Sequence, residues 1–209
     1  MKTCMYLVRH GATAANLAQP NFLQGQTLDL DLAPLGVRQA LLTSEYLALQ
    51  PIRAVYCSPM KRAVQTARIL AQPRQLPTDI VAELTECHVG RWEGLTWEQI
   101  MQQDPEYYNL FQADPAHYGY PGGESFAEVL VRVTNAVHRL LATHAGETIL
   151  VVSHHIVLRV YLASVLGLEP QLSRRIKLDN CSISCICSEN GETYVVTVNS
   201  GLHLNGCGC

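Results

Sequence analysis

Residues 6–11 read Tyr6-Leu7-Val8-Arg9-His10-Gly11, an apolar run followed directly by two polar side chains and a glycine. The apolar run predicts a short buried strand that ends at the glycine. In open α/β folds, ligands bind beyond the carboxyl ends of the strands, so Arg9 and His10 are expected at a ligand-binding edge. A guanidinium offers a planar set of donors to phosphate oxygens, and a neutral imidazole offers a lone pair to phosphorus. Three residues alone are a weak signal, so the interpretation depends on the remaining sequence.

The size and charge of the chain exclude several classes of protein. The chain has 209 residues, enough for a single domain over residues 1–209, and a formal net charge of −3 at pH 7. Acidic and basic residues are scattered, which argues against a nucleic-acid-binding surface or a polybasic membrane anchor. No apolar run is long enough to span a membrane, and the sequence enters its first strand without a signal peptide. A cytoplasmic location is therefore expected.

Apolar segments of strand and helix character alternate along the chain. Strands are expected at residues 5–8, 54–56, 80–81, 148–152, 176–187 and 193–198, and helices at 35–49, 58–71, 124–142 and 156–166. This order predicts the α/β class, with a three-layer α/β/α arrangement and a mostly parallel central sheet. The last two strands should turn at Asn190-Gly191. In the first helix, the recurring apolar residues are expected to face the core; they are Val37, Ala40, Leu41, Tyr46 and Leu47.

Three predicted strands end in polar residues, namely Arg9-His10, Ser58 and Ser153-His154. Parallel strands bring their carboxyl ends to one edge of the sheet, so these side chains should converge on one cleft.

The helix after the second strand should contribute to the same cleft. Ser58 is expected as its N-cap and Pro59 as its first residue. A helix N-terminus supplies free N–H groups and a partial positive charge, and Arg62 lies one turn further along.

Residues 83–123 have a different character, because aromatic residues and prolines gather there. We expect short helices and loops that form a cap or insertion over the active site rather than a separate domain; this range is called the cap segment below. Glu86 lies within it and is a candidate general acid. On chemistry alone, Glu83 and Glu93 are alternatives.

The chain contains eight cysteines. Cys181, Cys185 and Cys187 share one parity along a predicted strand, so we interpret them as small buried hydrophobic residues, with a metal site as the alternative. Cys207 and Cys209 lie in a glycine-rich tail, where two thiols could bind metal or oxidise, although a frayed terminus is expected.

Cys57, ahead of the second helix, raises the alternative of a cysteine-based phosphatase. The protein tyrosine phosphatase loop has five residues between its cysteine and arginine, whereas four residues separate Cys57 from Arg62. The glycines of such a loop are also absent, so Cys57 is expected to be a buried strand residue.

Together the motifs resemble the histidine phosphatase superfamily, which is also called phosphoglycerate mutase-like. The matching residues, in the family's order, are 9–16, Gln24-Gly25, Asp29, Leu32, Gly36, Gln39, Ala40, Ser58-Pro59, Arg62, Gln65, Thr66, Ala67, Leu84, Glu86, Gly90, Trp92-Glu93-Gly94, 121–125 and Val152-Ser153-His154. The resemblance covers nearly the whole chain, and the motifs are specific as a set.

This resemblance implies a metal-independent phosphomonoesterase of the histidine acid phosphatase type, which needs no cofactor. His10 would attack phosphorus and form a phosphohistidine, and Glu86 would protonate the leaving oxygen. Arg9, Arg62 and His154 would hold the phosphoryl oxygens. The implied substrate-binding residues are Thr13, Asn16, Gln24, Gly25 and His155.

The sequence departs from the family pattern at two positions. Residue 12 is Ala where the family usually has Glu, and residue 155 is His where a Gly usually follows the second catalytic histidine. His155 adds bulk and a hydrogen-bonding group beside the expected phosphate site.

The resemblance favours the small phosphatase branch that includes α-ribazole phosphatase. The chain lacks the proline-rich insertion of the phosphoglycerate mutases, and Thr13 and Trp92-Glu93-Gly94 match the phosphatases better. The alternatives are a 2,3-bisphosphoglycerate-dependent phosphoglycerate mutase and a non-catalytic relative that binds phosphorylated ligands. The expected partner is a small phosphorylated metabolite such as α-ribazole phosphate, phosphoglycerate, a sugar phosphate or phosphoserine, and a homodimer is compatible with the sequence.

Overall fold

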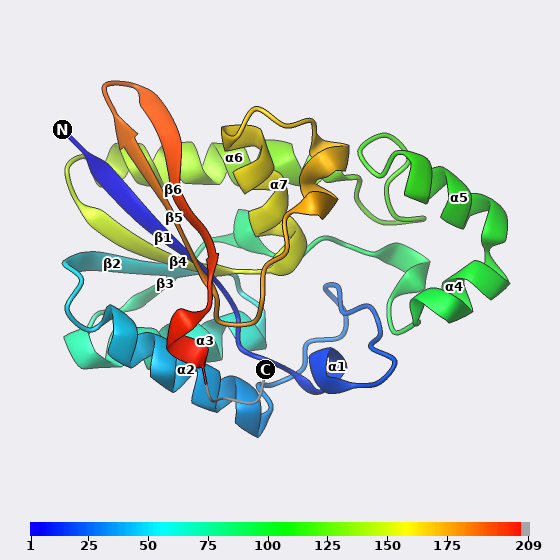
Figure 1. Ribbon diagram of the computed structural model, residues 1–209, viewed down its shortest axis with the longest axis horizontal. Coiled ribbons are helices and arrows are strands. Elements are labelled where there is room, and N and C mark those ends of the chain that lie inside the picture. Colours follow the sequence, from blue (N-terminus) through cyan, green and yellow to red (C-terminus); the bar gives the residue numbers. More distant parts are fainter. Residues whose placement is uncertain (206–209) are drawn as a thin grey trace.

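A six-stranded sheet forms the centre of the molecule (Figure 1). The computed structural model describes residues 1–205. The strands are β1 (Thr3–Arg9), β2 (Ile52–Cys57), β3 (Thr78–Ile80), β4 (Thr148–Ser153), β5 (Ile183–Glu189) and β6 (Glu192–Ser200), in the spatial order β3-β2-β4-β1-β5-β6. The first four strands pair in parallel, whereas β5 is antiparallel to both β1 and β6.

Helices cover both faces of this sheet. Figure 1 shows α2 (Pro34–Leu47) and α3 (Lys61–Ala71) below the sheet, and α6 (Phe126–Thr143) and α7 (His155–Val165) on the opposite side. Each side has its own apolar core, and β4 is buried along nearly its whole length because it lies between the two cores. The predicted three-layer α/β/α class with a mostly parallel sheet is thereby confirmed.

The cap segment forms the elongated end of the molecule. It contains α4 (Trp97–Gln103) and α5 (Pro105–Ala113), which lie away from the sheet in Figure 1. Trp92 is almost fully buried and packs edge-on against four other rings; these belong to Trp97, Tyr107, Phe111 and Tyr120. Trp92, Phe111 and Tyr120 therefore form the core of this segment, whereas Tyr118 is exposed.

The predicted terminal hairpin is present, but it begins later than expected. Asn190 and Gly191 both have positive φ values, 54° and 85°, as a tight hairpin turn requires. Its first strand starts at Ile183 rather than at residue 176, because residues 170–175 form a 3₁₀ helix and Cys181 has a φ of 58°.

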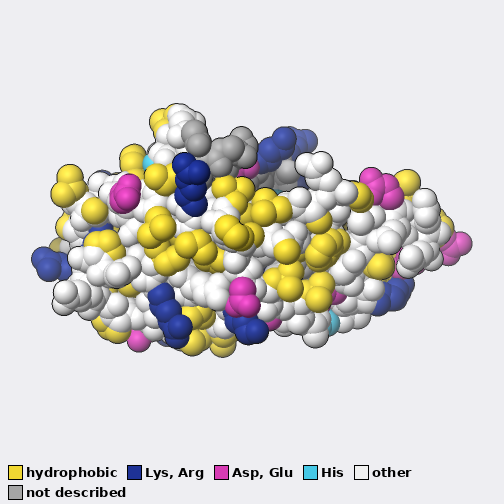
Figure 2. Space-filling view, turned by 90° about the horizontal axis from the view of Figure 1, so that it is seen from below, with side chains coloured by type: hydrophobic (Ala, Val, Ile, Leu, Met, Phe, Trp, Pro, Cys, Tyr) yellow, Lys and Arg dark blue, Asp and Glu magenta, His cyan; other side chains and the backbone are white. Residues whose placement is uncertain are grey.

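The orientation predicted for α2 is wrong for three of the five apolar residues that were expected to face the core. Val37, Leu41 and Tyr46 are exposed, and Figure 2 shows hydrophobic side chains spread over the side of the molecule that is seen from below, where α2 lies. Ala40 and Leu47 are buried as predicted. The rest of the buried face consists of small and polar residues, namely Gly36, Gln39, Thr43 and Ser44. Their side-chain hydrogen bonds go to Ala12 in the loop after β1, to Cys181 ahead of β5 and to Ile69 in α3.

The predicted start of α3 is also wrong. The helix begins at Lys61 with Met60 at its N-cap, not at Ser58. The Ser58 hydroxyl accepts a hydrogen bond from the Met60 N–H at 3.3 Å, and its other partner is His154. Ser58 therefore holds the segment before the helix instead of capping it.

The interpretation of Cys187 as a free buried thiol is wrong, because Cys187 forms a disulfide with Cys4. These residues face each other across the antiparallel β1–β5 pair, with a Cα–Cα distance of 4.2 Å. The sequence contains no pattern that predicts how two strands so far apart along the chain align with each other. Cys181 and Cys185 are buried, as expected, and Cys207 and Cys209 lie outside the described residues.

Within residues 1–205, none of the helices combines the length and apolar character needed to cross a membrane. Also within this range, no group of three or more potential ligands could hold a metal ion.

Two glycines let α2 approach the loop that follows β1. A Cβ on Gly36 would lie 2.1 Å from the Ala12 carbonyl oxygen, and one on Gly11 would lie 2.4 Å from the Gly36 carbonyl oxygen. This loop carries His10, so the backbone contact sets the position of the strand end.

We predict that Gly36→Ala destabilises the protein by about 1–3 kcal/mol, because the added methyl group overpacks this contact. Helix propensity alone would give the opposite sign, a gain of up to about 1 kcal/mol. Urea unfolding measures the difference, with Gly201→Ala as the control, since a Cβ there meets nothing within 4 Å. Equal or greater stability of Gly36→Ala would contradict the close approach.

Candidate active site

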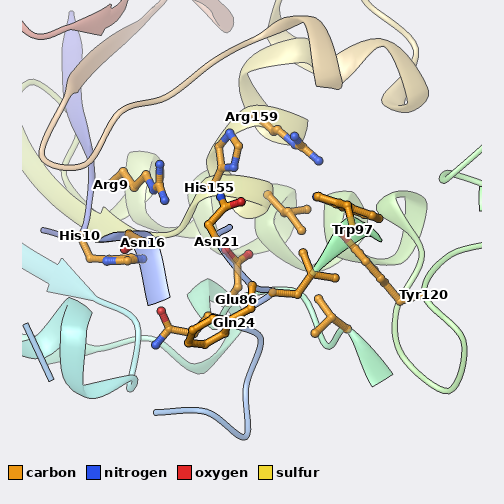
Figure 3. Close-up of a pocket in the computed structure, with 14 residues that line it drawn as sticks. Arg9, His10, Asn16, Asn21, Gln24, Glu86, Trp97, Tyr120, His155 and Arg159 are labelled. Carbon is orange, nitrogen blue, oxygen red and sulfur yellow. The ribbon is translucent and has the colours of Figure 1, made fainter. Parts of the chain in front are cut away.

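A pocket of about 220 Å³ opens at the carboxyl ends of β1 and β4, and Figure 3 shows its lining side chains. They come from the loop after β1, the cap segment and the first turns of α7. The lining residues are Arg9, His10, Asn16, Asn21, Phe22, Leu23, Gln24, Glu86, Val89, Trp97, Tyr120, His155, Ile156 and Arg159.

The predicted convergence of the polar strand ends is found. The His10 N–H donates to the Ser153 carbonyl at 3.0 Å, and the rings of His10 and His154 lie 5.1 Å apart. His154 Nε2 lies 2.7 Å from the Ser58 hydroxyl oxygen. Three strands thus bring one buried cluster together.

The hydrogen bond of His10 selects its tautomer. Nδ1 lies 2.8 Å from the Gly11 carbonyl oxygen, which can only accept, so Nδ1 carries the proton. In the neutral ring, Nε2 is then the nitrogen with the free lone pair.

All three histidines of the site are held in the neutral form. Burial, reinforced by the charges of Arg62 and then Arg9, keeps the pKa of His10 well below its ordinary value. Burial and Arg62 lower the pKa of His154 in the same way. Burial, with Arg9 and Arg159, lowers the pKa of His155 to about 2.

Arg9 and Arg62 are fixed by backbone carbonyls and still have donors to spare. Arg9 Nη1 donates to the Leu178 carbonyl at 2.7 Å, and Arg62 Nη2 donates to the Gly25 carbonyl at 2.9 Å. The Nε groups of both arginines are buried without a hydrogen-bond partner, as is Nδ1 of His154. Buried donors are normally paired, so the unused Nε–H groups of Arg9 and Arg62, whose charges act on His10, suit an anion with several oxygens.

Two predicted substrate-binding residues do not line the pocket and act behind it. The Thr13 hydroxyl contacts Asn16 Oδ1 at 3.1 Å and Gln24 Oε1 at 2.8 Å, so it orients two residues that do line the pocket. Gly25 holds Arg62 through its carbonyl. Neither Arg62 nor His154 is a lining residue, although their charges and hydrogen bonds bear on His10.

Of the three candidate acids, Glu86 alone is a lining residue. One carboxylate oxygen of Glu86 accepts from the Cys87 N–H at 2.8 Å. Glu93 accepts from the backbone N–H groups of residues 25, 27 and 28, which holds that loop. Glu83 forms an ion pair with Arg139 at 2.8 Å on the surface. Cys57 is buried in β2, and burial raises the pKa of its thiol to about 11, as expected of a strand residue rather than a nucleophile.

Sequence reasoning missed several functional neighbours. Asn180 donates to the His10 carbonyl at 2.9 Å and to Asn16 Oδ1 at 3.2 Å from a distant part of the chain. Asn21 and Arg159 line the pocket as well. Arg159 could have been found, because it follows His155 by four residues and such residues share one face of a helix.

The neutral burial of His155 predicts a dependence of stability on pH. The unfolded histidine takes up a proton below about pH 6.5, whereas the folded one stays neutral, so stability is complete above that pH and is lost on acidification. Each such histidine steepens the loss by about 1.4 kcal/mol per pH unit. We predict that His155→Gln makes the pH dependence of the free energy of unfolding, measured in urea from pH 7 to pH 5, less steep by about 1 kcal/mol per pH unit, because the unfolded histidine is only partly protonated near pH 6.5. A slope identical to that of the wild type would contradict the buried neutral state.

The comparisons with known proteins agree with this geometry. The model of the histidine phosphatase superfamily (branch 1) matches residues 5–201. The chain is 35% identical over 211 residues to a metal-independent phosphoserine phosphatase of Arabidopsis thaliana, which covers 99% of this chain and 85% of the relative. It is 32% identical over 182 residues to the adenosylcobalamin/alpha-ribazole phosphatase of Escherichia coli, covering 87% of this chain and 88% of the relative. The solved structure of Bacillus stearothermophilus YhfR matches with a TM-score of 0.89 and 30% identity, covering 97% of this chain and 99% of the other. On its motifs, fold and relatives, this chain belongs to the histidine phosphatase superfamily.

Proposed function

We propose that His10 is the nucleophile with which this phosphomonoesterase hydrolyses the phosphate esters of small metabolites. One observation carries the assignment. His10 is buried and neutral, its Nδ1 proton is donated to the Gly11 carbonyl, and Arg9 and Arg62, whose charges act on it, each have a buried Nε–H without a partner. An unprotonated Nε2 with a free lone pair, beside an anion site, is the arrangement that attack on phosphorus requires.

The reaction takes two displacements. In the first, His10 Nε2 forms a bond to phosphorus while the bond from phosphorus to the ester oxygen breaks. Glu86 gives that oxygen its proton. In the second, Glu86 takes a proton from water, the water oxygen bonds to phosphorus, and the phosphorus–nitrogen bond breaks. Inorganic phosphate leaves, and His10 is neutral again.

The cations of the site act on the charge that spreads over the phosphoryl oxygens during each transfer. Arg9 and Arg62 supply fixed positive charge, and His154 supplies a neutral donor. Because these groups are already oriented by the backbone and by Ser58, little reorganisation is needed during the reaction.

Asn16 and Gln24 line the pocket beside His10 and are proposed to bind the substrate, with His155 on its other side. The named activities of the relatives support a phosphoserine-like or α-ribazole phosphate-like ester.

A mutase would share the phosphohistidine and pass the phosphoryl group to a second phosphoglycerate. Assays with and without 2,3-bisphosphoglycerate separate the two reactions, and we expect release of inorganic phosphate without this activator. Cell fractionation and analytical ultracentrifugation would test the proposed cytoplasmic location and homodimer.

His10→Ala should lower kcat at least about 10⁴-fold, because the covalent step is lost. The comparison variant is His138→Ala, an exposed position on α6 outside the pocket. Phosphate release from a panel of phosphorylated metabolites measures the effect. Turnover by His10→Ala within tenfold of the wild type would overturn the nucleophile assignment.

Glu86→Gln should slow alkyl phosphates about 10²–10⁴-fold and aryl phosphates much less, because a good leaving group needs no proton. Glu83→Gln is the matched control, since Glu83 pairs with Arg139 outside the pocket. The measurement is kcat/KM across esters of graded leaving-group pKa. A uniform loss on all esters would refute the acid role of Glu86.

A further inference from the structure

The pocket extends beyond the proposed phosphate site to a second cation, Arg159. Arg159 lies on α7 four residues after His155, so both side chains leave the same face of the helix, one turn apart. Figure 3 shows His10 and Arg9 at one end of the pocket, and Arg159 toward Trp97 and Tyr120 at the other.

Arg159 differs from the other arginines that are not exposed. Within the described residues, each of the others donates to a backbone carbonyl or a carboxylate; these are Arg9, Arg62, Arg74, Arg132 and Arg174. Arg159 has neither a hydrogen bond nor an ion pair in the part of the chain from residue 1 to residue 205, and its Nε is buried without a partner.

The guanidinium of Arg159 lies over an aromatic ring. Its central carbon lies 5.0 Å from the centre of the Phe126 ring, within the range of a cation–π contact. Removing a charge from water without giving its donors partners is unfavourable. Such a group at the wall of a substrate pocket is suited to an anionic part of the ligand.

The size of the pocket limits the kind of ligand that can contact both Arg159 and the proposed phosphate site beside His10. Arg159 and His10 line the same pocket of about 220 Å³, so one small ligand can place a phosphoryl group next to His10 and an anionic group on Arg159. Between them stands His155, which is neutral and can donate a hydrogen bond without adding charge. Glu86 is the carboxylate among the lining residues, and it forms no ion pair with Arg159.

We propose that Arg159 binds a carboxylate of the substrate, so that the enzyme acts on phosphate esters of short hydroxy or amino acids. The proposal rests on the function proposed above, because it assumes that the phosphoryl group sits beside His10. A planar carboxylate matches the fork of guanidinium donors. Neutral sugar phosphates and nucleoside-type phosphates such as α-ribazole phosphate do not offer this group.

Comparing the hydrolysis of two substrates isolates the contribution of the carboxylate. O-phosphoserine and O-phosphoethanolamine share the phosphate ester and the ammonium group and differ in the carboxylate alone. We expect the wild type to hydrolyse phosphoserine with a kcat/KM about 10- to 100-fold higher, the usual range for a charge-assisted contact in a site built for it. A ratio near one in the wild-type enzyme would overturn the proposal without any variant.

The variants then assign the preference to Arg159. Arg159→Gln should reduce the ratio to about one, chiefly through loss of phosphoserine hydrolysis. Arg159→Lys keeps the charge without the fork and should give an intermediate ratio. The matched control is Arg174→Gln, because Arg174 also lies over a ring, that of Phe111 at 5.6 Å, but is bound to Phe111 and Gln112 and does not line the pocket. It should keep the wild-type ratio.

The failures of the two proposals can be told apart. If no phosphate ester is hydrolysed, the proposed function fails. If both compounds are hydrolysed and Arg159→Gln, folded by circular dichroism, or Arg159→Lys keeps the full preference, the assignment to Arg159 fails while the function stands.

Discussion

The parallel pairing of β1 with β4 is the constraint on which the site depends. Its register sets Arg9 opposite Ser153, so His10 and His154 leave the sheet at the same edge. The backbone bond from His10 to Ser153 continues this pairing past the strand ends. The glycine contact between α2 and the loop after β1 then fixes the loop from the other side. The chemistry of the site is therefore a consequence of strand order and close backbone packing.

Burial gives these groups their reactivity. In water, His10 would be partly protonated near neutral pH, and a protonated ring has no lone pair for phosphorus. Removing it from solvent and placing Arg9 and Arg62 nearby keeps it neutral, while the same arginines attract the anionic substrate. The arrangement combines an uncharged nucleophile with positively charged surroundings, which an exposed site could not maintain.

Patterns that depend on local geometry were predictable from the sequence, and those that depend on distant partners were not. The strand ends at His10 and His154 follow from apolar runs and the parallel-sheet rule. The outward face of α2 was mispredicted because polar residues such as Gln39 find hydrogen-bond partners inside, which a hydrophobic pattern does not show. The disulfide of Cys187 depends on a register between the two ends of the chain. The role proposed for Arg159 depends on the absence of hydrogen-bond partners for its guanidinium among the described residues, and only the packed structure shows this absence.

The most direct test of the central claim is to locate the phosphoryl group on the enzyme during turnover. The enzyme would be mixed with a radiolabelled phosphate ester, quenched in alkali within milliseconds, and digested for mass spectrometry. We expect base-stable, acid-labile phosphate on the peptide that carries His10, formed and lost at rates compatible with kcat. Label on another residue, or turnover without any phosphoenzyme, would contradict the account.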